Sequence, residues 1–204
     1  MASHYDAQSR GRAAGDAAAP VVRRPQLKGP YHPTFRSNVV RDLACILDLN
    51  PDVRTWTNGV TALKVGRASH VADLQMEDAD GSLWLLDTFD RKLPRDHAVI
   101  SEVASTRQCR YRVVDRSEIY DGFRLRNAKD LLRYAGHNVP LGDRVRLLAG
   151  LDEHGPLSLA DCLRTVRESQ PVATVASLVL QGLLELEIDD ALIGPETMVR
   201  RIRA

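Results

Sequence analysis

The chain contains no apolar run that approaches the roughly 20 residues needed to span a bilayer, and its first residues lack the apolar core of a signal peptide. Cysteine is scarce: Cys45, Cys109 and Cys162 lie far apart and match no C-x-x-C metal spacing. They indicate buried thiols in a reducing compartment rather than a disulfide framework. The net charge of +1 requires neither nucleic acid nor a membrane. These absences predict a cytoplasmic protein without membrane contact.

The charges that are present are unevenly distributed. Residues 1–28 hold five basic and two acidic groups, whereas residues 139–204 hold seven arginines and ten acids. The first segment is rich in Ala, Gly, Ser and Arg and has little apolar periodicity. Such a segment cannot bury enough surface to offset the entropy of ordering it, so residues 1–28 are predicted to be a disordered basic arm that could touch DNA phosphates.

Residues 29–116 have the pattern of a compact α/β layer, and the whole chain, 44% hydrophobic over 204 residues, can form one large or two small cores. Ser37 can cap the first helix, and Asn50-Pro51 ends it because the residue before proline disfavours the α region. The expected elements are a helix over 35–49, strands over 53–56 and 60–65, a hairpin over 70–89, a helix over 95–107 and a strand over 109–114.

The hairpin is the most informative stretch of the chain. Two strands, 70–76 and 82–89, flank an acidic tip that contains Asp80-Gly81, a strong hairpin signal. Each strand carries one carboxylate in an apolar run, Asp73 in the first and Asp87 in the second. Two acids on neighbouring strands can converge on a divalent cation, which prefers oxygen ligands.

Residues 139–204 have the pattern and length of a mostly α winged helix-turn-helix domain. They follow a connector, 117–138, with one helix over 127–135 that ends at Gly136. Ser158 is an N-cap for the second helix of the domain. The expected elements are helices over 142–151, 159–167 and 171–183, then wing strands over 185–188 and 191–193 that flank Asp189-Asp190.

Several short motifs follow one another along the middle half of the chain. They are Ser37, Asn50-Pro51-Asp52-Val53, His70-Val71-Ala72-Asp73, Asp80-Gly81, Leu86-Asp87, the strand at Tyr111 to Val114 and the helix at Asn127 to Leu132. In this order the run from Ser37 to about Leu132 resembles the TnsA-like endonuclease subunits of bacterial heteromeric transposases. These form a branch of the PD-(D/E)XK nuclease superfamily. The resemblance implies a nuclease-like fold in which Asp73 and Asp87 hold a metal ion.

Two positions depart from this family pattern. The helix glutamate of the family falls on Val40, and the lysine two residues after the second acid falls on Phe89. Because the metal and the lysine together activate water, these degenerate positions imply an impaired nuclease. An alternative is a site displaced by three residues at Asp90-Arg91-Lys92, with Lys92 as the catalytic lysine. Strand alternation argues against it, since Asp90 would face away from Asp87.

A purely structural interpretation of Asp73 and Asp87 also stays open, in which each acid pairs with an arginine. Arg91, Arg107 and Arg110 are the candidate partners. DNA contact is expected from the nuclease-like face and from the third helix of the winged domain, whose segment 171–187 contains no Lys or Arg. The DNA-binding candidates are Arg36, Arg41, Arg107, Arg110, Arg112, Thr174, Ser177, Gln181, Arg200 and Arg201.

The sequence thus predicts an α/β (α+β) nuclease-like domain followed by a winged helix. The leading hypothesis is a catalytically impaired, TnsA-like factor that associates with double-stranded DNA or assembles a complex in a bacterial mobile-element, recombination or regulatory system, near the nucleoid. The expected partners are DNA, a transposase, ATPase or regulator, and a second copy of the chain. No cofactor is expected beyond residual Mg²⁺ or Mn²⁺. The alternatives are an active endonuclease using Asp73, Asp87 and Lys92, and a winged-helix regulator that works through protein contacts.

Overall fold

A computed structural model describes residues 27–93 and 98–203 as a mixed α/β protein. The basic arm predicted over 1–28 lies almost wholly outside these residues. The helices are α1 (Asn38–Leu49), α2 (Ala98–Ser105), α3 (Arg116–Tyr120), α4 (Arg124–Leu131), the 3-10 turn η1 (Leu132–Tyr134), α5 (Leu141–His154), α6 (Leu159–Thr165) and α7 (Pro171–Leu180). The strands are β1 (Val53–Asn58), β2 (Ala62–Val65), β3 (Ala68–Val71), β4 (Leu74–Asp78), β5 (Leu83–Thr88), β6 (Cys109–Val114), β7 (Leu157–Ser158), β8 (Leu184–Leu186) and β9 (Met198–Arg201).

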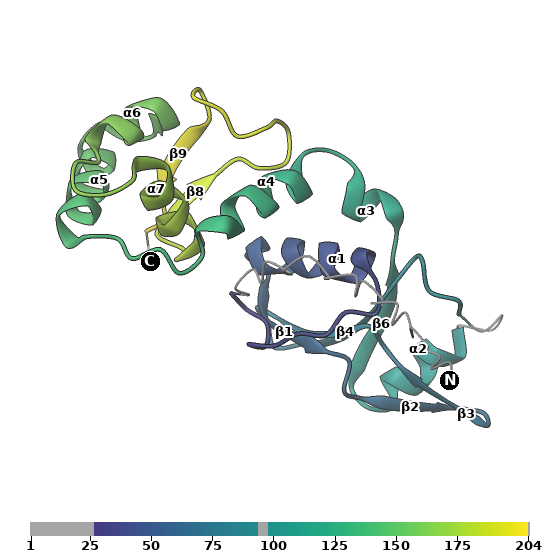
Figure 1. Cartoon of the computed structure of the whole chain (residues 1–204). Coiled ribbons are helices and arrows are strands. Elements are labelled where there is room, and N and C mark those ends of the chain that lie inside the picture. The colour runs from purple at the N-terminus through teal and green to yellow at the C-terminus, as the bar shows by residue number, and fades with distance from the viewer. Residues whose placement is uncertain (1–26, 94–97, 204) are drawn as a thin grey trace, which may run out of the picture.

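The N-terminal part is built on a four-stranded sheet in the order β1-β4-β5-β6. β1 and β4, and β4 and β5, are antiparallel, while β5 and β6 are parallel and joined through α2. Helices α1 and α3 cover one face, and α2 with the β2–β3 hairpin covers the other (Figure 1). The predicted order of helix, antiparallel strands, helix and final strand is therefore confirmed for the described residues.

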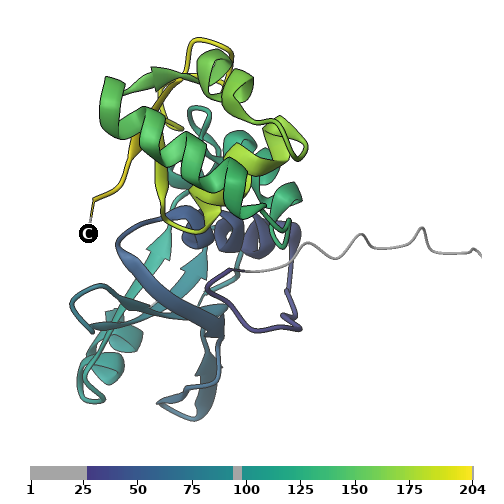
Figure 2. The ribbon, with the colours of Figure 1, turned by 90° about the vertical axis from the view of Figure 1, so that its left-hand side faces the viewer.

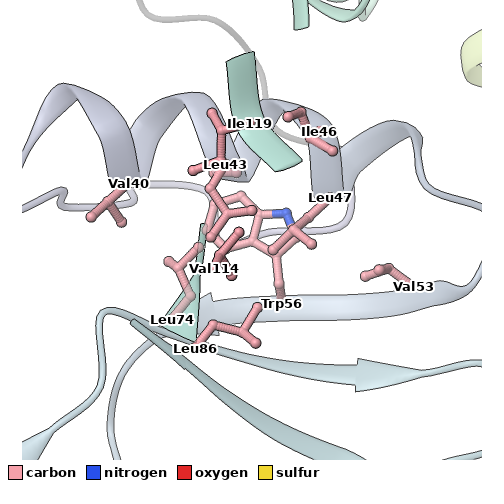
Figure 3. Close-up of a cluster of buried hydrophobic side chains, with 11 residues drawn as sticks. Val40, Leu43, Ile46, Leu47, Val53, Trp56, Leu74, Leu86, Val114 and Ile119 are labelled. Atoms are coloured by element: carbon pink, nitrogen blue, oxygen red, sulfur yellow. The ribbon is translucent and has the colours of Figure 1, made fainter. Parts of the chain in front are cut away.

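Helix α1 is buried over most of its length because the sheet lies beneath it and α3 and α4 lie above it. The Ser37 side chain accepts a hydrogen bond from the N–H of Val40, which confirms the predicted cap. Val40, Leu43 and Leu47 point from α1 toward Trp56 and the sheet (Figure 3). The three cysteines are buried, as predicted.

The single strand predicted over 70–76 is wrong, because the chain crosses between two sheets at Ala72 and Asp73. β3 pairs with β2, whereas β4 joins the main sheet. Gly59 makes this crossing possible: a Cβ on Gly59 would lie 1.7 Å from the carbonyl oxygen of Ala72. The Asp80-Gly81 turn is confirmed, with Gly81 at φ +86° between β4 and β5. The break leaves Asp73 at the junction rather than inside a strand.

The C-terminal part has its own core and lies on the opposite side of α1 from the main sheet (Figure 2). Helices α5, α6 and α7 surround a three-stranded sheet in the order β7-β9-β8. Leu131 of α4 belongs to this core, and Leu49 of α1 and Tyr134 of η1 pack against it. The connector is thus an integral layer between the two parts.

Several predicted boundaries need correction. Only 98–105 of the helix predicted over 95–107 is helical among the described residues, and residues 95–97 fall outside them. The connector helix starts at Arg124 rather than Asn127, and α3, whose Glu118 accepts from the N–H of Asp115, was missed. Ser158 caps α6 as predicted. Among residues 27–93 and 98–203, no helix has the length and apolar character needed to cross a membrane.

Asp143 is a buried carboxylate that fixes the turn before α7. It accepts hydrogen bonds from the backbone N–H groups of Arg167 and Glu168, from Ser169 Oγ and from Arg146. Burial acts to raise the pKa of Asp143, but these hydrogen bonds outweigh it and hold that pKa far below its ordinary value. A carboxyl group of this kind stabilises the fold above its unfolded pKa, about 3.9.

The stabilising effect of the Asp143 carboxylate is lost as the pH falls through its lowered folded pKa. Asp143→Asn is therefore expected to destabilise the protein at neutral pH and to make its stability depend less on pH in the acid range. Urea midpoints measured from about pH 7 down to about pH 3 test this. Asp161→Asn, at an exposed carboxylate on α6, is the matched control. An unchanged acid slope in Asp143→Asn would contradict the assigned role.

Candidate functional site

The two acids predicted from the hairpin, Asp73 and Asp87, lie side by side. Leu74 on β4 pairs with Leu86 on β5 in antiparallel register. Asp73, one residue before Leu74, therefore lies opposite Asp87, one residue after Leu86. The backbone N–H of Asp73 donates to Asp87 Oδ1 at 2.9 Å. The side chain of Asp73 is 1% exposed and that of Asp87 is 0% exposed. The predicted convergence of these carboxylates is confirmed.

Asp87 has hydrogen-bond partners on both of its oxygens. Oδ1 accepts from the backbone of Asp73 and from Arg91 Nη1 at 2.9 Å. Oδ2 lies 2.7 Å from His70 Nε2 and accepts from the Tyr111 hydroxyl at 2.8 Å. Strands β3 and β6 thus supply two polar groups, and the turn after β5 supplies the cation.

Asp73 is held even more tightly, between two guanidinium groups. Oδ1 accepts from Arg36 Nε at 2.8 Å and from Arg91 Nη1 at 2.7 Å. Oδ2 accepts from Arg36 Nη2 and from the backbone and hydroxyl of Thr88. One nitrogen, Arg91 Nη1, therefore bridges Asp73 and Asp87. A positively charged group stands between the two acids.

The electrostatics of this cluster favour the charged forms of Asp73, Asp90 and Arg36. Burial acts to raise the pKa of Asp73, but hydrogen bonds from Arg36 and the Thr88 backbone, with the charge of Arg91, hold that pKa below its ordinary value. The hydrogen bond to Asp73 in turn raises the pKa of Arg36. Asp90 also accepts from Arg36, at 2.8 Å. Burial is outweighed there too, and the pKa of Asp90 falls to about 2.

The residues present do not fit a resident Mg²⁺ or Mn²⁺. A hard divalent cation needs carboxylate oxygens with lone pairs that are free to coordinate it. Each of the four oxygens of Asp73 and Asp87 already accepts at least two hydrogen bonds. Within the described residues, no group of three or more His, Cys, Asp or Glu is arranged to hold a metal ion. A cation could enter only by displacing an arginine.

The two degenerate positions have structural roles of their own. Val40 is 1% exposed and packs in the cluster under α1 (Figure 3). Phe89 is half-buried against the same cluster, and its ring meets that of Tyr120 edge to face, with centroids 6.2 Å apart. Neither side chain can bind a cation through oxygen.

The displaced site at Asp90-Arg91-Lys92 differs from what strand alternation predicts, which is that Asp90 faces away from Asp87. β5 ends at Thr88, and the N–H of Arg91 donates to the Thr88 carbonyl in a turn. The turn carries Asp90 toward the cluster, where its Oδ1 lies 2.6 Å from Thr88 Oγ1, the hydroxyl that also lies beside Asp73. Lys92 is exposed and forms no ion pair with an acid of the described chain. The prediction that Asp90 faces away is therefore wrong.

No protein-family model matches the chain, and no curated protein matches it in a sequence comparison. The assignment of this cluster therefore depends on its own chemistry.

Some of the predicted DNA-binding arginines are engaged with acids or an aromatic ring, and others are exposed. Arg36 is committed to the acid cluster, and Arg112 pairs with Glu118. Arg110 lies over the Trp84 ring at 5.1 Å. The interpretation that Arg107 or Arg110 neutralises the strand acids is wrong, and that of Arg91 is confirmed. The remaining candidates Arg41, Arg107, Arg200 and Arg201 are exposed, and Arg201 pairs with Asp152.

Two of the three residues predicted on the DNA-facing side of the third winged-domain helix are buried. Thr174 is 0% exposed and Ser177 is 2% exposed, whereas Gln181 is exposed. Ser177 Oγ donates to the carbonyl of His137, which follows η1, and α7 packs against η1 and α4. The predicted exposure fails because the connector contacts Ser177 and the turn before α7 contacts Thr174 through Ser169. In this arrangement the side of α7 that carries Thr174 and Ser177 cannot contact DNA.

The two strands predicted to form a wing also differ from the structure. The second strand is not 191–193 but β9, so the connecting loop is longer than expected. That loop is docked on α4: Asp189 forms two hydrogen bonds with Arg124, and Asn127 donates to the carbonyls of Ile188 and Ala191. Asp189, one of the two acids of the predicted wing tip, is therefore paired with an arginine and held in place.

Sequence reasoning missed three groups of the acid cluster: Arg36 as a clamp, Tyr111 as a donor and Thr88 as a second donor. An arginine just before the cap of the first helix gave no local signal, because it meets Asp73 only after the chain has folded. Parallel pairing of β5 and β6 could have indicated Tyr111, since it lies near Asp87 across that pair.

Proposed function

We propose that this chain is a nuclease-fold protein that associates with DNA, or assembles a complex on it, without cleaving it efficiently. It would serve a bacterial mobile-element, recombination or regulatory system, as the TnsA-like resemblance implies. The observation that carries the proposal is the Arg91 bridge between Asp73 and Asp87. A guanidinium supplies positive charge and hydrogen bonds, but it cannot activate water as a metal-bound hydroxide does.

Two further observations support DNA association. Exposed arginines lie on the nuclease-like part, including Arg41 and Arg107. A hollow of about 570 Å³ on α4 is lined by Arg126, Lys129, Asp130 and Arg133. Lys129 pairs with Asp42 and Arg133 with Asp130, so Arg126 is the cation of this hollow without an ion pair among the described residues. Basic side chains of this kind supply most of the non-specific affinity for DNA. Together they place positive charge on the connector as well as on the sheet domain.

A second candidate function is protein contact through the C-terminal part. The burial of Thr174 and Ser177 removes the side of α7 that would read bases. A groove of about 530 Å³ beside β8 is lined by three glutamates and one arginine, Arg200, together with Leu192 and Met198. Apolar side chains rimmed by acids favour a basic, amphipathic protein segment over DNA.

Titration into labelled duplex DNA with Mn²⁺ present, analysed on native and denaturing gels, tests the proposal. We expect retention that weakens steeply with salt, without strand breaks. Breaks that disappear in Asp73→Ala would contradict it and establish the active endonuclease. Absence of any retention at low salt would favour the protein-contact function instead.

A further inference from the structure

Arg116, the first residue of α3, is held by aromatic rings rather than by an acid. Its guanidinium carbon lies 5.2 Å from the centre of the Tyr120 ring and 5.8 Å from that of Phe89. The two rings meet at an interplanar angle of 78°, so they form a corner in which the guanidinium rests. The side chain is exposed, and no carboxylate of the described residues forms an ion pair with it.

This contrasts with the neighbouring arginines of the sheet domain. Arg36 and Arg91 are bound to buried acids, and Arg112 is bound to Glu118. Their donors are already used, so an anion could recruit them only by breaking an existing pair. The stacked guanidinium of Arg116 keeps its N–H donors available, because ring contact occupies its face and leaves its edge free.

The corner lies next to the acid cluster and at the carboxyl ends of two parallel strands. Phe89 follows the last residue of β5, and its N–H donates to the carbonyl of Val114, the last residue of β6. Asp90, the next residue, belongs to the cluster. Ligands of open α/β sheets bind outside the carboxyl ends of parallel strands, so Arg116 is well placed for one.

We propose that Arg116, stacked on Phe89 and Tyr120, is a contact for a phosphate group of the DNA backbone. The inference depends on the proposed DNA association and specifies which side chain carries part of it. Phe89 stands where the family pattern has lysine. The positive charge at this position is instead that of Arg116, which stacks on the Phe89 ring. A guanidinium that is already stacked loses less conformational freedom when it binds phosphate in bidentate fashion.

Fluorescence anisotropy with a labelled DNA duplex in EDTA, over a series of salt concentrations, tests this inference. Arg116→Gln is expected to weaken binding on the order of tenfold at low salt, the scale of one charged hydrogen bond, and to reduce the salt slope by about one. Phe89→Leu keeps the charge but removes one ring, so we expect a smaller loss. Arg54→Gln, on β1 at the opposite edge of the sheet, is the matched control.

The outcomes separate this inference from the proposed function. Salt-sensitive binding by the unchanged protein, with the same affinity and slope in Arg116→Gln, would overturn the Arg116 contact and leave DNA association standing. Equal losses in Arg116→Gln and Arg54→Gln would also overturn it, because only net charge would then matter. No binding by the unchanged protein would overturn both proposals. Thermal melting of each variant confirms that it is folded.

Discussion

Arg91→Ala is expected to lower the free energy of unfolding by about 3–5 kcal/mol. The Arg91 side chain is 22% exposed, while the carboxylates of Asp73 and Asp87 that it bridges have at most 1% exposure. Removing the shared cation leaves two negative charges in contact in a medium of low dielectric constant. Because Arg36 still neutralises Asp73, we expect the loss of unfolding free energy to lie toward the lower end of this range. Chemical denaturation measures it.

Two further variants show whether the bridging nitrogen is responsible. Arg91→Lys can place an ammonium where Nη1 lies, so it should recover part of the loss. Arg54→Ala breaks an exposed ion pair with Glu77 and should cost no more than about 1 kcal/mol. An Arg91→Ala variant as stable as Arg54→Ala would show that the bridge does not hold the site together.

Val40→Glu is the second change with a large expected effect. The resemblance would make it a restoration of a catalytic acid, but Val40 is 1% exposed and packs in the cluster with Leu43 and Trp56. A carboxylate there has no free cation to meet, since Arg36 and Arg91 are already bound to acids. We expect destabilisation of about 3 kcal/mol or more, from burying an unpaired charge in an apolar environment.

Arg41→Glu is the matched control for this substitution. It lies on the same turn of α1 but is exposed, so the charge it introduces remains solvated and the cost should stay within about 1 kcal/mol. Val40→Glu should also regain stability as the pH falls, because the buried carboxyl group is accommodated when protonated. Equal stability of the two variants at neutral pH would mean that the space at Val40 accepts a carboxylate.

The sequence was most predictive where the signals are local. The cap at Ser37, the turn at Gly81 and the strand at 109–114 were all found where expected. The convergence of Asp73 and Asp87 also followed, because it needs only a hairpin and its register. Each of these depends on residues that lie close together in the chain.

The failures share a different cause, which is contact between distant segments. Arg36 meets Asp73 from 37 residues away, and Asn127 holds the loop between β8 and β9 from more than 60 residues away. Exposure of Ser177 was predicted from helical periodicity, but a polar residue can be buried when a distant segment satisfies it, as the carbonyl of His137, 40 residues away, does here. Periodicity identifies a face of a helix; it does not say whether a connector will cover it.

The central claim, that arginines close the two-acid site to metal, is tested most directly by thermal melting after EDTA treatment, with and without Mn²⁺. A ligand that binds only the folded state raises the melting temperature in a saturable manner. We expect no such rise for the unchanged protein, and a rise in Arg91→Ala that disappears when Asp87→Asn is added. A saturable rise in the unchanged protein that Asp87→Asn abolishes would contradict it.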